Sequence, residues 1–446
     1  MEGSEFQIIE RKGGHVLLCN GHQYYKHRKY ANESVIWYCC GRKKEKCTGS
    51  LTLEGNKIIK SKEHTTPTPG QCKPNEQKNE VALTLDKIKQ IGAQKSDPLP
   101  TIFNENVRGL YEKGLNFVVP VPSFPNVKHA LYNARKKELQ ITKTVFKSVD
   151  EVEVPAKYNK DFLIADYIYE GSRILVFCKS EAKKYFCRVK EYFGDATFRT
   201  PYPFSQLFTI HGALGDGSTD TNVVPLVYAL MSDKKETTYF ALFDILKANF
   251  EDFHPQKFHC DFEFAPSNAL KAIFPDVTLK KCYYHFTNSI WRKAKSLQIK
   301  KNKRYRRIVG LCAALALLPQ HLVIQGWTYV QEQANDIQNE NMTTFMRYMK
   351  RTWLKSDDYV SQWCVYNERH RTNNVAESFH SRLNRLINKN YVTIFKLLHV
   401  LYEFSTNPVP KKRRSQEIEN DSFIINKQME LIHNDINIGH FLETMR

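Results

Sequence analysis

Hydrophobic and polar residues alternate differently along the chain, and the changes of pattern divide it into regions. Residues 1–70 hold short runs of aromatic and polar residues separated by polar turns, which predict a small β-rich unit. Residues 71–160 are polar with amphipathic stretches such as VALTLDKIKQIGAQ and proline-containing breaks, which predict helices in a linking region. Residues 406–446 are predicted to form a basic and polar tail.

The pattern from residue 161 to residue 405 is more regular. Four strand candidates follow one another: ILVFC, YFGDATF, LFTIHGAL and VVPLVYALM, the last two joined by GDGSTD, whose Asp-Gly indicates a hairpin. Helical and strand-like segments then alternate until residue 297. Residues 300–370 are mostly helical, and a further helix begins near Asn374. This order predicts an α/β fold with a mixed sheet and helices on its faces.

The composition agrees with a folded protein of two or three units, because 41% of the 446 residues are hydrophobic. The longest apolar stretch, VGLCAALALL, is about half of the ~20 residues that a membrane span needs, so we expect no membrane partner. No secretory signal is recognised at the N-terminus. The eleven cysteines are therefore expected to be buried thiols or metal ligands rather than a disulfide framework.

The net charge of +19 indicates a polyanionic partner, most simply nucleic acid. Residues 286–310 contain nine Lys or Arg and no acidic residue, which accounts for nearly half of this charge. A solvated helix face would show the same composition, but nine like charges repel one another, and an anionic partner relieves that repulsion. The candidate DNA-binding residues in this segment are Arg292, Lys293, Lys300, Lys301, Arg304, Arg306 and Arg307.

Three acidic residues stand out by their positions. Asp195 lies in the middle of an aromatic strand, where an unpaired carboxylate is costly, and Asp261 ends the short strand of FHCDFEFA. Glu377 lies in the first turns of the late helix. If the two strands are neighbours, the three carboxylates can meet and share divalent cations, which would offset the cost of burial. Isolated loop acids would look the same, and Glu263 is expected to be a structural or supporting acid.

Residues 185–300 resemble a MULE (Mutator-like element) transposase domain. The resemblance rests on YFGDATFRTPYPFSQLFTIHGALGDGSTD, on FHCDFEFAPSNALKAIFPDVTLKKCYYHF and on the later RTNNVAESFHSRLN, which is similar to the family segment TNN-x-x-E-x-x-H. It implies an RNase H-like fold with a helical insertion at about residues 300–370. It also implies a catalytic DDE triad of Asp195, Asp261 and Glu377 that binds magnesium or manganese. Transposases of this kind usually act as multimers, so a homo-oligomer is expected.

Cys282 and His285 match the Cys-x-x-His motif that such transposases carry after the second aspartate. The resemblance implies that they order the active site or contact DNA. A buried thiol beside a hydrogen-bonded histidine would explain the pair equally well. The two residues could also form half of a zinc site, although no second pair of cysteine or histidine residues follows nearby.

The N-terminal unit has a second candidate metal site. Cys39 and Cys47 bracket a basic loop, His64 follows, and a structural zinc ion would stabilise so small a β unit. The segment GHQYYKHRKYANESVIWYCCGRKKEKCTGSLTLEGN resembles a FLYWCH-type zinc finger, a family that uses two Cys and two His, usually ending in His-x-His. This chain departs from that pattern after His64, so either Cys72 is the fourth ligand or the site is incomplete. Cys40 is expected to be a bystander.

Basic residues in two places fit contact with DNA or nuclear import. Arg42, Lys43, Lys44 and Lys46, between the two cysteines, suit phosphate contact. The cluster PKKRR at residues 410–414 resembles a nuclear-import signal, which predicts a location in the nucleus, although solvated tails often carry such runs.

Together these patterns predict a DNA transposase that cleaves DNA and transfers strands with the acidic triad, and binds DNA through the zinc finger. A domesticated, non-catalytic DNA-binding regulator derived from a transposase is the alternative. A host RNase H-like nuclease would fit the triad but leaves the finger and the TNN segment unexplained.

Overall fold

The computed structural model describes residues 5–11, 14–68, 70–95, 97–139, 146–198, 202–214, 223–387, 393–406 and 415–446. The chain divides into two compact units, residues 1–142 and residues 143–446. The predicted hairpin turn GDGSTD and the basic cluster at 410–414 lie outside the described residues. No helix of the described ranges is both long enough and apolar enough to cross a membrane.

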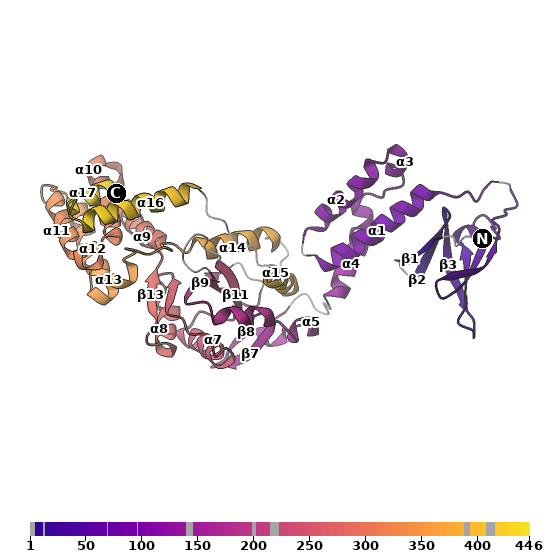
Figure 1. The fold of residues 1–446 in the computed structure, drawn as a ribbon, viewed down its shortest axis with the longest axis horizontal. Coiled ribbons are helices and arrows are strands. Elements are labelled where there is room, and N and C mark those ends of the chain that lie inside the picture. The colour runs from indigo at the N-terminus through magenta and orange to yellow at the C-terminus, as the bar shows by residue number, and fades with distance from the viewer. Residues whose placement is uncertain are drawn as a thin grey trace. The chain divides into compact units, whose positions relative to one another are not determined.

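The first unit contains an antiparallel sheet of six strands paired in sequence order, which confirms the predicted N-terminal β unit (Figure 1). The alternating residues of its strands place Leu17, Tyr24, Trp37 and Leu51 in a small core on one face. The strands are β1 (Phe6–Arg11), β2 (Gly14–Cys19), β3 (His22–Lys29), β4 (Val35–Cys39), β5 (Ser50–Glu54) and β6 (Lys57–Lys62), with a 3₁₀ turn η1 (Cys40–Arg42) after β4.

In the described part of the first unit, four helices follow the sheet, and the first of them is fastened to it. Ala82 packs with Ile9 and Val16, and the Asn79 side-chain amide donates a hydrogen bond to the His22 carbonyl at 3.2 Å. The helices also share a core of their own that includes Phe103. They are α1 (Glu76–Gln94), α2 (Leu99–Tyr111), α3 (Leu115–Val118) and α4 (Phe124–Glu138).

The second unit is built on a seven-stranded mixed sheet in the order β13-β12-β9-β10-β11-β8-β7, in agreement with the predicted mixed sheet. Strand β12 runs parallel to both β9 and β13, whereas the strands from β9 to β7 pair antiparallel. The strands are β7 (Leu163–Tyr169), β8 (Ser172–Phe177), β9 (Glu191–Thr197), β10 (Gln206–Ala213), β11 (Val223–Met231), β12 (Lys257–Cys260) and β13 (Thr278–Lys281).

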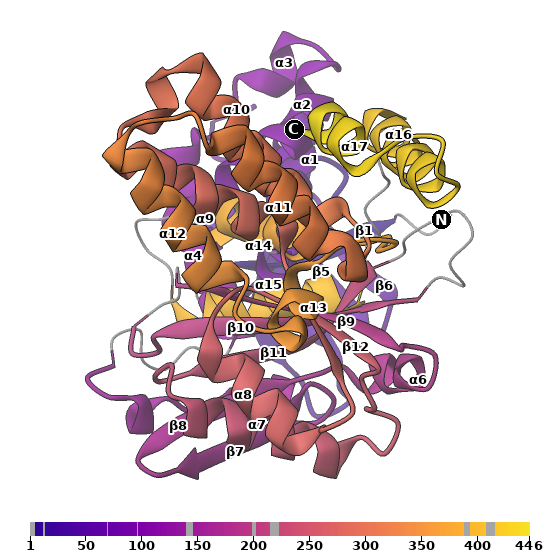
Figure 2. The same ribbon diagram turned by 90° about the vertical axis from the view of Figure 1, so that its left-hand side faces the viewer.

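Helices cover both faces of this sheet. Figures 1 and 2 show α7 (Glu236–Asn249) and α8 (Phe264–Ile273) on one face, with α14 (Asn374–Ile387) and α15 (Ile394–Thr406) on the other. The α7 and α8 side holds the main core, which includes Tyr192, Phe208, Phe243 and Phe258. Short segments connect the first strands: η2 (Val149–Glu151), α5 (Ala156–Asn159), η3 (Ser180–Ala182) and α6 (Lys183–Phe186).

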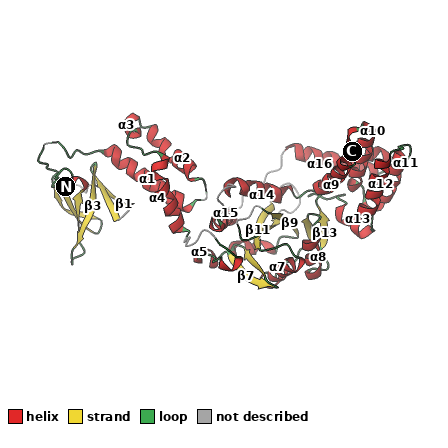
Figure 3. Cartoon of the chain, turned by 180° about the vertical axis from the view of Figure 1, so that it is seen from behind, coloured by secondary structure: helices red, strands yellow, loops and turns green. Residues whose placement is uncertain are grey.

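The remaining helices form a helical lobe beside the sheet, visible in Figure 3. The lobe comprises α9 (Tyr283–Ser296), η4 (Ile299–Lys301), α10 (Lys303–Ala314), η5 (Leu315–Leu317), η6 (Gln320–Leu322), α11 (Val323–Ala334), α12 (Glu340–Trp353), α13 (Asp357–Trp363), α16 (Ser415–Ile432) and α17 (Ile438–Met445). Helices α16 and α17 occur where the sequence suggested a polar tail. They bury Leu431, Phe441 and Leu442 in the core of the lobe, contacts that a mostly polar segment does not reveal by its composition.

Gly194 marks a close approach in the main core. A methyl group at this position would lie 2.6 Å from Phe258 Cε1 and 2.8 Å from Phe208 Cζ, and both rings are buried. We therefore expect Gly194→Ala to destabilise the second unit by about 1–3 kcal/mol, measured by thermal denaturation. Gly109→Ala in α2, where a methyl group meets nothing within 4 Å, is the control and should cause no loss. Equal melting temperatures for the Gly194 variant and the unmodified protein would contradict this packing.

Candidate functional site

Strand β9 carries the first candidate acid on the face opposite the main core. Because side chains alternate along a strand, Glu191, Phe193 and Asp195 share the face covered by α14, while Tyr192 and Gly194 face α7 and α8. The Asp195 side chain is only 13% exposed. Its carboxylate accepts a hydrogen bond from the Ala196 backbone N–H at 2.9 Å.

Asp261 directly follows the last residue of β12. Strand β12 pairs with β9, so the two strands are neighbours, as predicted. Asp195 and Asp261 line one cavity of about 60 Å³. Glu263, at the start of α8, lines the same cavity, and burial together with Asp261 raises its pKa. The other lining residues are Gly194, Ala196, Phe198, Phe208, Cys260 and Pro266.

Glu377 lies in the first turn of α14, and its approach to the strand acids is fixed by Asn373. The buried Asn373 donates its side-chain amide to the Gly194 carbonyl at 3.1 Å and its backbone N–H to Cys282 Sγ at 3.3 Å. Burial raises the pKa of Glu377, His285 opposes that rise, and the charges of Asp195 and Asp261 add to it. The charges of both strand acids therefore act on Glu377.

Each strand acid also lies beside a histidine from a helix. His285 Nδ1 of α9 is 2.9 Å from Asp261 Oδ1, and His380 Nδ1 of α14 is 2.9 Å from Asp195 Oδ2. Close contact with Asp261, and then with Cys282, raises the pKa of His285 to about 11. On its other side, His380 Nε2 lies 3.0 Å from the Thr209 hydroxyl, so Asp195 is held by a chain of polar side chains.

A second polar cluster lies at the other end of β9. Glu191 forms hydrogen bonds with His259 at 2.6 Å and with His370 at 3.1 Å. Although burial raises the pKa of Glu191, the bonds to both histidines lower it well below its usual value. Glu368 binds Lys257 at 2.6 Å. These pairs fasten the segment before α14 to the sheet and so help to place Glu377.

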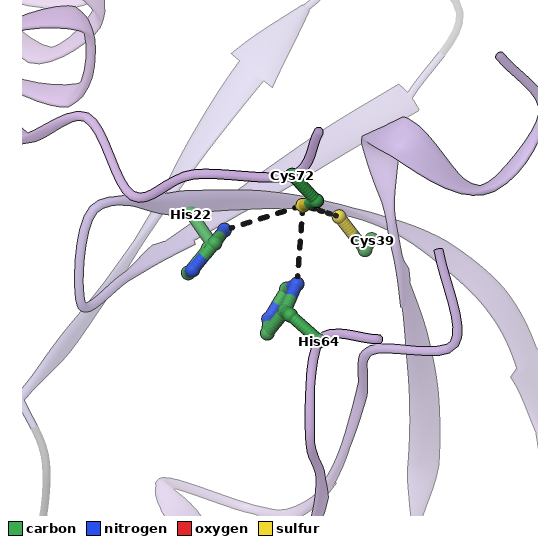
Figure 4. Close-up of side chains that lie close together, drawn as sticks. All are labelled: His22, Cys39, His64 and Cys72. Atoms are coloured by element: carbon green, nitrogen blue, oxygen red, sulfur yellow. Dashed lines mark hydrogen bonds between the residues drawn. The ribbon is translucent and has the colours of Figure 1, made fainter. Parts of the chain in front are cut away.

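The N-terminal unit brings the ligand atoms of Cys39, His64 and Cys72, three of the predicted zinc-ligand candidates, and of His22 within 4.8 Å of one another (Figure 4). Cys72 Sγ lies 3.6 Å from Cys39 Sγ and 3.4 Å from His64 Nδ1, and Cys47 Sγ lies 3.3 Å from His64 Nδ1. Edges of about 3.5–3.8 Å are expected between ligands of tetrahedral zinc. The structure adds His22, whose ring stacks on His64 with centroids 3.6 Å apart.

The surroundings of these side chains suit a zinc site. The backbone N–H groups of Gly41 and Gly49 point to Cys39 Sγ and Cys47 Sγ at 3.3 and 3.4 Å. The Tyr24 hydroxyl is 2.8 Å from His64 Nε2, which leaves Nδ1 to face the sulfur atoms. Burial, reinforced by His22, lowers the pKa of His64 to about 4, so this imidazole is neutral, the form that binds metals. The exposed Cys40 is outside the cluster.

The predicted DNA-binding residues differ in their surroundings. Arg42, Lys43, Lys44 and Lys46 are exposed, and the Arg42 guanidinium lies 4.0 Å from the Tyr38 ring centre. In the helical lobe, Arg307 is paired with Glu443, a contact between α10 and α17. The half-buried Lys293 lies near the Tyr348 ring. Among the other predicted DNA-binding residues of this lobe, Arg292, Lys301, Arg304 and Arg306 are exposed. The side chain of Lys300 lies outside the described part of the chain.

Sequence reasoning did not single out His22, Asn373 or His380 as site residues. For His380 a signal was present, because Glu377 and His380 are three residues apart and so share one helix face. Asn373 belongs to the quoted TNN segment but looks like an ordinary residue before a helix. His22 follows the turn between β2 and β3, and no spacing rule connects it to cysteines further along the chain.

Comparison with protein families confirms both resemblances. The model of the MULE transposase domain matches residues 192–289, and the model of the FLYWCH zinc finger domain matches residues 7–65. The first match includes Asp195, Asp261 and the Cys282–His285 pair but ends before Glu377, and the second ends before Cys72. No curated protein matches this chain. The two domains together indicate a transposase-like, DNA-binding protein.

Proposed function

We propose that this protein is a DNA transposase whose active site consists of Asp195, Asp261 and Glu377. The observation that carries the proposal is the cavity lined by Asp195 and Asp261 together, with Glu377 near enough for the charges of both aspartates to raise its pKa. The central strand order β11-β10-β9-β12-β13, with β12 parallel to its neighbours, supports an RNase H-like arrangement of this sheet.

The proposed chemistry is phosphodiester hydrolysis followed by strand transfer. Asp195, Asp261 and Glu377 would hold magnesium or manganese, ions that prefer carboxylate oxygens and would supply an activated attacking oxygen and a stabilised leaving oxygen. Water would first release a 3′-hydroxyl, and that hydroxyl would then attack target DNA. Both steps are displacements at phosphorus, so one set of acids can serve both.

DNA binding would come from the zinc finger and the basic helical segment. The FLYWCH-type finger would bind zinc through Cys39, Cys47, His64 and Cys72, with Arg42, Lys43 and Lys44 at the phosphates. Arg292, Lys301, Arg304 and Arg306 would contact the backbone of DNA at the catalytic unit. A homo-oligomer and a location in the nucleus belong to the same proposal.

The test is cleavage of DNA that carries the terminal repeats flanking the coding sequence. We expect nicks with 3′-hydroxyl ends, and joining of those ends to target DNA, in Mg²⁺ or Mn²⁺ but not in EDTA. Binding should be measured on the same samples over a range of salt concentrations, since phosphate contacts weaken as salt rises. Tight, salt-sensitive binding without cleavage in either metal would overturn the transposase and support a captured, non-catalytic DNA-binding regulator.

A further inference from the structure

The contact between Asp261 and His285 is unusual for a pair of these residues. Asp261 Oδ1 and His285 Nδ1 lie 2.9 Å apart. Both atoms are shielded from solvent, yet among the described residues neither has a hydrogen bond of acceptable geometry. The two atoms thus form a close charged contact without a well-aligned hydrogen bond, and a ligand that binds both side chains would replace this contact with well-aligned bonds.

The acid–histidine contacts of Glu191 show what a simple ion pair looks like in the same unit. Glu191 binds His259 and His370 through hydrogen bonds of ordinary geometry at 2.6 and 3.1 Å. The neighbouring Glu368 is paired with Lys257 and Lys280. Among the described residues, Asp261 Oδ1 and His285 Nδ1 form no hydrogen bond of such ordinary geometry.

The third member of the group is the buried Cys282, three residues before His285. Its sulfur, His285 Nδ1 or Nε2 and an Asp261 carboxylate oxygen all lie within 4.8 Å of one another. Cys282 begins the turn into α9 and accepts the Asn373 backbone N–H at 3.3 Å. Hydrogen bonds of this kind stabilise a metal-bound thiolate and orient it.

We propose that Asp261, Cys282 and His285 form a binding site for a divalent transition metal ion, with zinc as the best match. In a tetrahedral site with ligands about 2.0–2.2 Å from the ion, neighbouring ligand atoms lie about 3.4 Å apart, so the 2.9 Å between His285 Nδ1 and Asp261 Oδ1 has to widen by about 0.5 Å to admit the ion. Thiolate and imidazole ligands disfavour magnesium, which takes oxygen ligands. Three protein ligands leave a fourth position for water or a phosphate oxygen.

This site is separate from the zinc finger and shares only Asp261 with the acids proposed for DNA cleavage. If the proposed function holds, the ion would lie beside the scissile phosphate. The metal assignment nevertheless does not depend on cleavage, because it can be measured directly as bound metal. Failure of one proposal therefore leaves the other standing.

The experiment is a measurement of zinc content by mass spectrometry on the full chain after equilibration with zinc and removal of the free ion. We expect Cys282→Ser and Asp261→Asn each to hold one zinc ion fewer per chain than the unmodified protein. Cys187→Ser, which changes an exposed thiol of the same unit, is the matched control and should retain the full zinc content. Circular dichroism establishes whether each variant is folded. If Cys282→Ser does not fold, the test relies on Asp261→Asn, because asparagine keeps the shape of the aspartate side chain.

Cobalt provides the second readout, because a thiolate bound to Co²⁺ gives an absorption band that an ion pair does not. The Co²⁺ spectrum should lose part of its thiolate band in Cys282→Ser. Folded Cys282→Ser and Asp261→Asn with the same zinc content and cobalt spectrum as the unmodified protein would overturn the proposal and leave a charged Asp261–His285 contact.

Discussion

Asp195→Asn is expected to reduce the rate of DNA cleavage by about 1000-fold or more. The substitution removes the charge of a side chain that is 13% exposed and placed at the cavity shared with Asp261. Loss of a charged metal ligand removes several kcal/mol of transition-state stabilisation, and each 1.4 kcal/mol corresponds to about a factor of ten. The measurement is the single-turnover nicking rate in saturating Mg²⁺.

DNA affinity should stay within about twofold of the unmodified protein, because asparagine keeps the size of the side chain and Asp195 is not a phosphate-binding residue. Asp244→Asn, an exposed acid on α7 on the other face of the sheet, is the matched control and should cleave at the normal rate. Cleavage by the Asp195 variant at the rate of the control would remove Asp195 from the active site.

The central part of the fold could be predicted because its strands are long, aromatic and separated by clear turns. Strands β8 to β13 and helices α7 to α9 follow the sequence pattern closely. Strand β7 was not predicted, since its residues are mostly exposed or half-buried and its hydrophobic alternation is weak. Helices α16 and α17 were missed for a related reason, because their few apolar residues become informative only when the lobe they cover is known.

The candidate site was predictable to the extent that its residues belong to motifs. Asp195 and Asp261 are conspicuous because carboxylates rarely lie within or directly after buried strands. The contacts of Asn373 with Gly194 and Cys282 join positions 179 and 91 residues apart, and no local periodicity encodes such a distance. Proximity of His22 to the cysteine cluster likewise depends on the pairing of β2, β3 and β4 in the folded sheet.

Removal of zinc from the finger is expected to have the largest effect on stability. Zinc contributes roughly 10–16 kcal/mol to isolated zinc fingers, comparable to the whole free energy of unfolding of a small domain, about 5–15 kcal/mol. The buried core around Trp37 is small and includes Cys39 and Cys47 themselves. Cys39→Ser should therefore lose zinc, unfold the six-stranded sheet and weaken DNA binding. Calorimetry should show this loss while the transition of residues 143–446 persists.

Cys40→Ser is the matched control, because Cys40 is the next residue in the chain but is exposed and outside the ligand cluster. It should keep both the zinc and the melting transition of the first unit. Cys72→Ser should weaken zinc binding more than His22→Ala. Cys72 Sγ lies 3.6 Å from Cys39 Sγ and 3.4 Å from His64 Nδ1, whereas His22 Nδ1 lies 3.7 Å from Cys72 Sγ and the His22 ring stacks on His64. If His22→Ala instead releases the zinc while Cys72→Ser keeps it, the fourth ligand is His22. The zinc ion would then connect β3 to the two cysteines that flank the basic loop.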